Sequence, residues 1–78
     1  MSRIVRITGA KKVGSRCVEA RVGNERLVTR QGIGGHYHYA EFRLDVSRTR
    51  ELFGIEARAV FMAAERAATI GRDVEVYL

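Results

Sequence analysis

Residues 36–46 read HYHYAEFRLDV, the longest alternating stretch in this chain, and they decide the class of fold. Successive side chains of a strand point to opposite faces, so this alternation predicts a long strand with one buried face. The expected core face carries His38, Ala40, Phe42, Leu44 and Val46. The expected opposite face carries Tyr37, Tyr39, Glu41, Arg43 and Asp45.

Shorter strands are expected on both sides of this stretch, at residues 3–8, 16–22, 26–31 and 73–78. They are rich in β-branched residues or alternate between apolar and polar positions. In the second of them, Val18, Ala20 and Val22 share one face, and Cys17, Glu19 and Arg21 share the other. Two turns separate the early strands: a glycine-bounded loop at residues 9–14 and a hairpin turn at residues 22–25.

A helix is expected at residues 55–70, which contain six alanines. Its apolar arc is predicted from a spacing of 100° per residue and comprises Ala59, Val60, Ala63, Ala64, Ala67 and Ile70. Met62 falls on the polar side, and Gly71 suits the C-terminal cap. Ser47 is a predicted N-terminal cap, with one or two helical turns at residues 48–53.

The resulting order is β-β-β-β-α-β, in one small domain that spans residues 1–78. We therefore predict an α+β fold, with an antiparallel sheet of four to five strands and one main helix packed on one face. A single helix covers only one face of such a sheet. The other face must meet water or a partner.

Composition places the chain among small folded proteins, with 46% hydrophobic and 29% charged residues in a total of 78. No apolar run approaches the roughly 20 residues of a membrane-spanning helix, and the start of the sequence carries no export signal. The single cysteine, Cys17, fits a reducing compartment, so a cytoplasmic protein is expected. A chain this short without a disulfide often gains stability from a partner.

The net charge of +5 is uneven along the chain. Residues 1–40 carry a net charge of +6, whereas residues 41–78 carry −1. A basic half of this kind is attracted to nucleic acid or to an acidic protein surface.

Arginine and tyrosine are interleaved on the sheet face that the helix leaves uncovered. Arginine donates two hydrogen bonds to a phosphate, and a tyrosine ring can stack on an unpaired base. The same residue types are enriched at protein–protein hot spots, and a plain solvated face is the third reading. The candidate binding residues are Arg6, Arg21, Arg26, Arg30, Tyr37, Tyr39 and Arg43.

Signals for catalysis or metal binding are limited to two histidines, His36 and His38, which are expected to project to one side of a strand. Two such imidazoles can ligate a metal or serve as general acid and base in RNA cleavage. Ordinary strand histidines fit the same spacing, and no further ligand is placed beside them. The loop at residues 32–35 lacks the Lys-Ser/Thr ending of a phosphate-binding loop. No cofactor, metal or catalytic residue is therefore assigned.

Residues 14–31 (GSRCVEARVGNERLVTRQ) form a hairpin signature, and residues 56–71 (EARAVFMAAERAATIG) form an alanine-rich helix before a closing strand. Over residues 14–78 this architecture resembles small binding proteins of phages and plasmids, among them many anti-CRISPR proteins. Many such inhibitors are acidic mimics of nucleic acid, and the charge of +5 departs from that pattern. The segment Gly34-Gly35-His36 is also similar to the glycine-histidine segment of HicA-type toxin ribonucleases, which begin with a helix that is missing here.

The resemblance implies a non-enzymatic inhibitor that engages a nucleoprotein complex through its basic Arg/Tyr sheet face. The alternatives are a small nucleic-acid-binding regulator and a histidine-dependent ribonuclease toxin. A homodimer joined through residues 74–78 is compatible with each of them, because an edge strand offers unpaired backbone groups.

Overall fold

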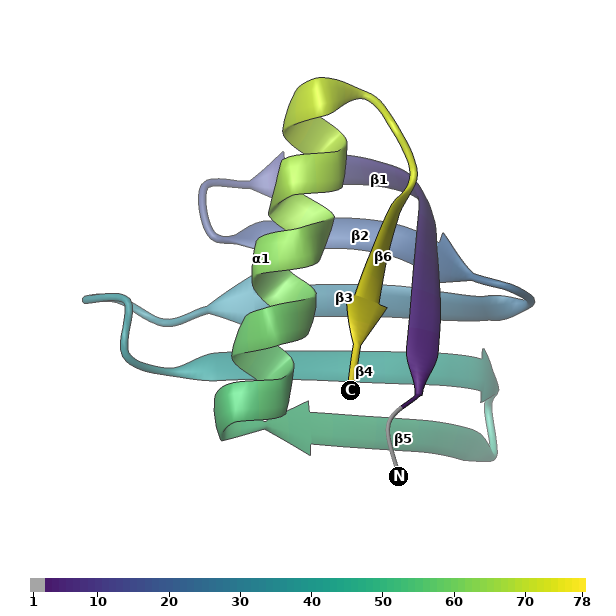
Figure 1. Cartoon of the computed structure of the whole chain (residues 1–78). Helices are drawn as coiled ribbons and strands as arrows, with labels where there is room; N and C mark the ends of the chain where they lie inside the picture. The colour runs from purple at the N-terminus through teal and green to yellow at the C-terminus, as the bar shows by residue number, and fades with distance from the viewer. Residues whose placement is uncertain (1–2) are drawn as a thin grey trace.

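The computed structural model describes residues 3–78, and its fold is α+β, with one helix packed on one face of an antiparallel sheet (Figure 1). The strands are β1 (Ile4–Gly14), β2 (Cys17–Val22), β3 (Glu25–Gln31), β4 (His38–Asp45), β5 (Arg48–Phe53) and β6 (Val74–Tyr77). The helix is α1 (Gly54–Ile70), and the strand order is β5-β4-β3-β2-β1-β6. The α+β class is confirmed, whereas the expected four to five strands fall short of the six observed.

The additional strand is β5, where one or two helical turns were expected. Leu52 and Arg50 lie on the inner face: Leu52 packs against the core, and the Arg50 guanidinium lies 4.7 Å from the centre of the Phe42 ring. Glu51 and Phe53 pair with Glu41 and Tyr39 on the outer face. Backbone pairing with β4 decides the conformation here, because tertiary contacts override a weak local preference for helix. The helix expectation for residues 48–53 was therefore wrong.

β1 is longer than predicted, because the expected loop at residues 9–14 continues the strand. Its first part, from Ile4 to Ile7, pairs with β6, and its later part pairs with β2. The part that pairs with β2 begins at Thr8 and contains a bulge between Thr8 and Lys11, where Gly9 provides the positive φ of 59°. Figure 1 shows the first half of β1 turning away from β2 to run beside β6. One strand thus serves two differently oriented parts of the sheet, with the change of partner after Ile7 and the bulge just beyond it.

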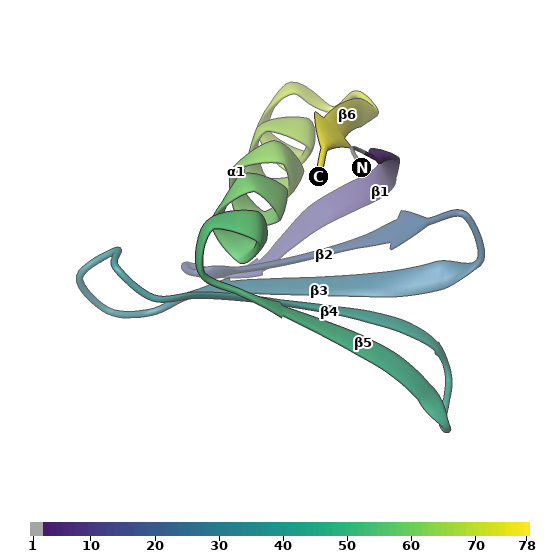
Figure 2. The same cartoon turned by 60° about the horizontal axis from the view of Figure 1, so that its bottom comes forward.

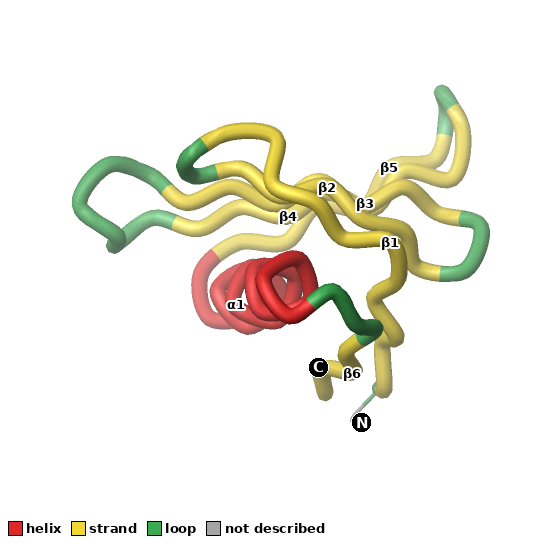
Figure 3. The backbone as a smooth tube through the Cα atoms, turned by 90° about the horizontal axis from the view of Figure 1, so that it is seen from above, coloured by secondary structure: helices red, strands yellow, loops and turns green. Residues whose placement is uncertain are grey.

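The sheet and helix form two layers with the core between them. Figure 2 shows α1 on one side of the sheet formed by β2 to β5, and Figure 3 shows β6 and the start of β1 curling toward the helix. The sheet side of the core consists of Val5, Ile7, Val18, Ala20, Leu27, Ala40 and Phe42. The helix side consists of Ala57, Val60, Phe61, Ala64 and Ala67. Within residues 3–78, no element covers the outer face of the sheet (Figure 2).

The helix is rotated relative to the predicted apolar arc. Ala57 and Phe61 are buried although they were not assigned to the arc, and Ile70 remains 49% exposed at the last turn. The sequence signal was weak because alanines occur all around this helix, so its largest apolar side chain, that of Phe61, decides which face is buried. Gly71 closes the helix as expected, with φ 70° and its N–H donating to the Ala67 carbonyl at 2.9 Å.

The sequence predicted that Ser47 caps a helix, and this was wrong. Ser47 instead forms part of the turn between β4 and β5. Its backbone N–H and its hydroxyl both donate to Asp45 Oδ1 at 2.8 Å. These hydrogen bonds, with one from Arg48, lower the pKa of the Asp45 carboxyl. Aspartate commonly bonds to the backbone two residues ahead in a turn, and this local bonding competes with capping.

The end of β4 departs from the expected core face. Leu44 is 42% exposed and Val46 is 98% exposed, although both were assigned to the core. The alternation holds through Phe42, and then the chain enters the Asp45–Ser47 turn. Only the first part of β4 lies under the helix (Figure 1), so alternation beyond it no longer produces burial.

Candidate binding face

The outer face of β2 to β5 carries side chains in rows that cross the strands. One of them, here called the arginine row, consists of Arg21 on β2, Arg26 on β3 and Arg43 on β4. Arg26 lies directly opposite both Arg21 and Arg43 in the two strand pairings. Neighbouring strands are about 4.8 Å apart, so the row places three guanidinium groups across a short span of the surface.

The arginine row is partly neutralised by glutamates. The Arg26 guanidinium lies 2.9 Å from a Glu19 carboxylate oxygen, and that of Arg43 lies 3.2 Å from Glu41. Arg21 has no carboxylate within 4.0 Å among residues 3–78. The charge of the row is therefore least compensated at its β2 end.

The neutralising carboxylates belong to a second row, here called the glutamate row. Across β5, β4, β3 and β2 it contains Glu51, Glu41, Val28 and Glu19. Glu41 and Glu51 face each other in one cross-strand pair, an arrangement that like charges normally disfavour. Glu51 has no cationic partner within 4.0 Å in the described part of the chain. The free negative charge thus lies toward β5, and the free positive charge lies toward β2.

A third row, here called the aromatic row, contains Phe53 on β5, Tyr39 on β4 and Arg30 on β3. The Tyr39 and Phe53 rings meet edge to face with centroids 5.4 Å apart, and the Arg30 guanidinium lies 5.9 Å from the Tyr39 ring centre. The Tyr39 hydroxyl donates to Glu41 at 3.0 Å. Burial, this hydrogen bond and the charges of Glu41 and Glu51 raise the pKa of Tyr39 to about 12.

Tyr37 lies at the rim of the aromatic row, just before β4 begins. Its carbonyl accepts a hydrogen bond from the Gly32 N–H at 2.8 Å, which closes the preceding loop. Together with Arg30, Tyr39 and Glu41 it lines a shallow hollow, and the Tyr37 side chain is 56% exposed. This end of the face therefore offers exposed aromatic surface beside both charge signs.

Six of the seven candidate residues lie together on this face or at its rim: Arg21, Arg26, Arg30, Tyr37, Tyr39 and Arg43. Arg6 lies apart, because the first half of β1 pairs with β6. Its guanidinium is 3.3 Å from Asp73 and 3.9 Å from Glu75.

The sequence reasoning did not include Glu51, Phe53 and Lys11 in the candidate surface. The first two were assigned to a helical segment, because RTRELF, residues 48–53, has no apolar/polar alternation that would indicate a strand. Lys11 was assigned to a loop, and only its pairing with Glu19 places it beside the glutamate row. The face is consequently more mixed in charge than the expected basic face.

The two histidines do not project together. His38 is buried on the inner face, with its ring centre 5.7 Å from that of Phe61 and its Nε2 3.3 Å from the Gln31 amide. His36 is exposed in the loop before β4. Within residues 3–78, no group of three or more His, Cys, Asp or Glu side chains is arranged to hold a metal ion.

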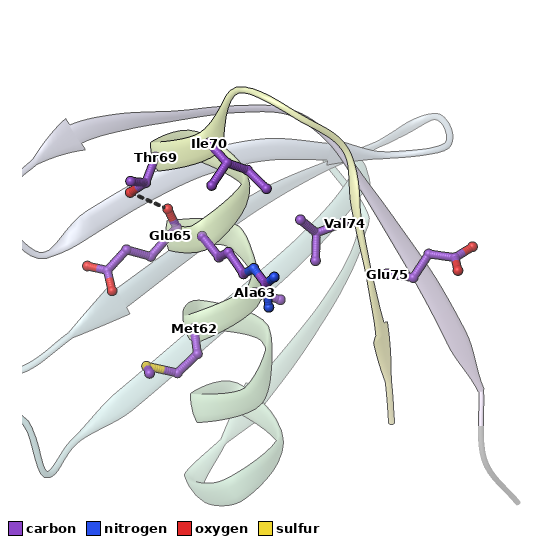
Figure 4. A pocket seen from close by; sticks show the side chains of 8 residues that line it. Met62, Ala63, Glu65, Thr69, Ile70, Val74 and Glu75 are labelled. Atoms are coloured by element: carbon purple, nitrogen blue, oxygen red, sulfur yellow. Dashed lines mark hydrogen bonds between the residues drawn. The ribbon is translucent and has the colours of Figure 1, made fainter.

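A different surface lies between α1 and β6 (Figure 4). It is an open, largely apolar groove lined by Met62, Ala63, Glu65, Arg66, Thr69, Ile70, Val74 and Glu75. Met62 is on the outward side of the helix, as expected, and is 50% exposed. The groove adjoins the edge strand β6, so its open side continues into unpaired backbone.

Comparison with protein-family models, curated proteins and solved structures finds no match to this chain. Within residues 3–78, no helix is long and apolar enough to cross a membrane.

Proposed function

We propose that this chain is a non-enzymatic binding protein, an inhibitor of the anti-CRISPR type carried by phages and mobile elements. It acts in the cytoplasm, where its lone Cys17 stays reduced, and it binds a protein surface of a nucleoprotein complex through the outer sheet face. The observation that carries this proposal is the arginine row and the aromatic row, with the glutamate row between them, on a face that no element within residues 3–78 covers.

The composition of this face favours a protein partner. Tyrosine and arginine are the residue types most enriched at protein–protein hot spots. Arg30 lies near the Tyr39 ring and Phe53 packs against it, so this aromatic anchor is held in place before binding. Side chains that are already ordered lose less conformational entropy when a complex forms.

The charge pattern argues against a polyanion as the main ligand. Arg21, Arg26, Arg30 and Arg43 share the face with Glu19, Glu41 and Glu51. A nucleic-acid strand lying across the face would bring phosphates near these carboxylates. A protein surface can instead present complementary charges of both signs.

The test is an affinity pulldown from the lysate of a host cell, with and without nuclease. The wild-type chain is compared with an Arg21→Glu/Arg43→Glu variant and with an Arg58→Glu/Arg66→Glu control. The control reverses two exposed arginines on α1, on the opposite side of the sheet. We expect a nuclease-resistant partner that the wild type and the control retain and the face variant loses.

Circular dichroism and thermal unfolding verify that all three chains are folded. Equal capture by the face variant would contradict the placement of the site. Capture that disappears after nuclease treatment would instead favour the nucleic-acid-binding regulator, whose affinity should fall steeply with salt. RNA cleaved by the purified chain would favour the ribonuclease alternative.

A further inference from the structure

The bulge in β1 lies beside the end of the arginine row where the positive charge is least compensated. Thr8 pairs with Arg21 and Lys11 pairs with Glu19, so two residues of β1 face Ala20 alone on β2. Such a bulge separates the strands locally and redirects the side chains next to it. A hollow of about 270 Å³ lies at this point, lined by Gly9, Lys11, Glu19, Ala20, Arg21 and Arg26.

The lining of this hollow is positive. It contains three cationic side chains, those of Lys11, Arg21 and Arg26, and one carboxylate, that of Glu19. Glu19 is engaged by Arg26 at 2.9 Å. Neither Lys11 nor Arg21 has a carboxylate within 4.0 Å among residues 3–78. Two cations therefore face the hollow without a neutralising partner.

We propose that this hollow binds a carboxylate from an acidic segment of the partner protein. The inference rests on the proposed function and specifies the chemistry of one part of the contact. The Arg21 guanidinium can donate two parallel hydrogen bonds to a carboxylate, and Lys11 adds a point charge from the neighbouring strand. Charge-assisted bonds of this kind are stronger than neutral ones.

A carboxylate fits this corner better than a phosphate backbone does. Within the arginine row, the uncompensated positive charge lies at the β2 end, because Arg26 and Arg43 are paired with Glu19 and Glu41. The next charged positions across the sheet from Lys11 are the carboxylates of Glu19 and Glu41. The phosphates of a nucleic-acid strand continuing in that direction would be repelled by these carboxylates. A short acidic segment can place its carboxylate in the hollow without extending negative charge toward them.

The experiment titrates the purified, isotope-labelled full chain with a hexa-aspartate peptide, followed by backbone amide NMR shifts. A hexaserine peptide controls for nonspecific effects. Lys11→Ala is compared with Lys12→Ala, a matched control: Lys12 pairs with Val18, whose side chain is in the core, and its amine is 3.8 Å from Glu65 of the helix. Both lysines are exposed, and the amide spectra report directly whether each variant is folded.

We expect saturable shifts at Gly9, Lys11 and Arg21 with hexa-aspartate and none with hexaserine. The Lys11→Ala variant should bind roughly tenfold more weakly, as expected for loss of one charge-assisted contact, and Lys12→Ala should bind like the wild type. Absence of saturable shifts, or equal loss in both variants, would overturn the assignment. If oligothymidylate shifts the same amides and binds more tightly than hexa-aspartate, the carboxylate assignment is also overturned, in favour of a phosphate site.

Failure of this titration can be distinguished from failure of the proposed function. The titration requires no knowledge of the partner and reports only on the hollow. A nuclease-resistant partner captured in the pulldown, without peptide binding at the hollow, would leave the face as the binding surface and remove the acidic contact. Peptide binding at the hollow without any captured partner would support the carboxylate site and count against the proposed function.

Discussion

Glu41 and Glu51 lie directly opposite each other on β4 and β5, so two carboxylates share one cross-strand pair on the outer face. Glu41 is compensated by the Arg43 guanidinium at 3.2 Å and by the Tyr39 hydroxyl at 3.0 Å. Glu51 has no cationic partner within 4.0 Å among residues 3–78. The structure thus retains a pair of like charges on a surface that we propose to be functional.

Replacing Glu51 by glutamine should stabilise the fold, because it removes this repulsion and keeps the shape of the side chain. Like charges in direct cross-strand pairs change stability by roughly 0.5 kcal/mol. Urea unfolding of Glu51→Gln should therefore show a raised midpoint and an unchanged slope. A lowered midpoint would mean that Glu51 makes a stabilising contact that outweighs its repulsion with Glu41.

Stability should fall at alkaline pH because of Tyr39. Its pKa in the folded chain is raised to about 12 from an ordinary value of 10.0, so the folded state holds this proton more tightly than the unfolded state. The contribution is complete below pH 10 and is lost as the pH rises through 12. Thermal unfolding midpoints measured between pH 10 and pH 12 should decline less in Tyr39→Phe than in the wild type. Identical declines would contradict the assignment.

Truncation of Phe61 should test which face of the helix is buried. Phe61 is 1% exposed, and Phe61→Ala should lower the free energy of unfolding by about 3–5 kcal/mol. The neighbouring Met62→Ala should change it by no more than about 0.5 kcal/mol. If Phe61→Ala does not fold, the milder Phe61→Leu provides the comparison. Similar effects at the two positions would be inconsistent with the observed helix orientation.

The bulge in β1 should depend on Gly9, whose φ of 59° is unfavourable for other residues. Gly9→Ala should cost about 1–2 kcal/mol of stability. Gly14 is the matched control, because it lacks a positive φ and an added Cβ would make only an ordinary 3.8 Å contact with Cys17. Gly14→Ala is expected to be neutral or slightly stabilising. Thermal unfolding of both variants measures the difference, and equal effects would argue against strain at Gly9.

The edge of β6 should join two copies of the chain, as the homodimer hypothesis requires. Arg3 and Leu78 exchange both backbone hydrogen bonds at 2.8 Å, so alternation along the strand turns the N–H groups of Glu75 and Tyr77 toward the open edge. We expect sedimentation at micromolar concentration to show a dimer. Glu75→Pro removes one outward backbone N–H and should weaken the dimer, whereas Glu75→Ala keeps this N–H and should leave the dimer unchanged. A monomer at every concentration would contradict the hypothesis.

Much of the fold could be predicted from local patterns. Alternation in residues 36–46 correctly placed Ala40 and Phe42 in the core and Tyr39, Glu41 and Arg43 on the other face. This worked because the side-chain period of a strand is a property of the backbone itself. Residues 48–53 were misassigned because a short, mostly polar segment next to a helix carries no strand pattern of its own, and only pairing with β4 makes it a strand.

The candidate face was only partly predictable. Local alternation assigned Arg21 and Arg43 to the outer face, but their alignment through Arg26 depends on strand register. Arg6 lies apart from them because the start of β1, up to Ile7, pairs with β6, whereas pairing with β2 and its bulge begin only after that. Neither register nor bulge was deduced from the order of residues along one strand.

The sequence by itself determined the α+β class, the core positions Val18, Ala20, Ala40 and Phe42, and the outward placement of Arg21, Tyr39 and Arg43. It also showed a basic first half and a nearly neutral second half. Only the tertiary structure decided what those charges meet, because β4 and β5 return Glu41 and Glu51 to the face that carries the arginines. Charge interactions depend on distance in space, so strand pairing converts a segregation along the chain into alternating rows on one surface.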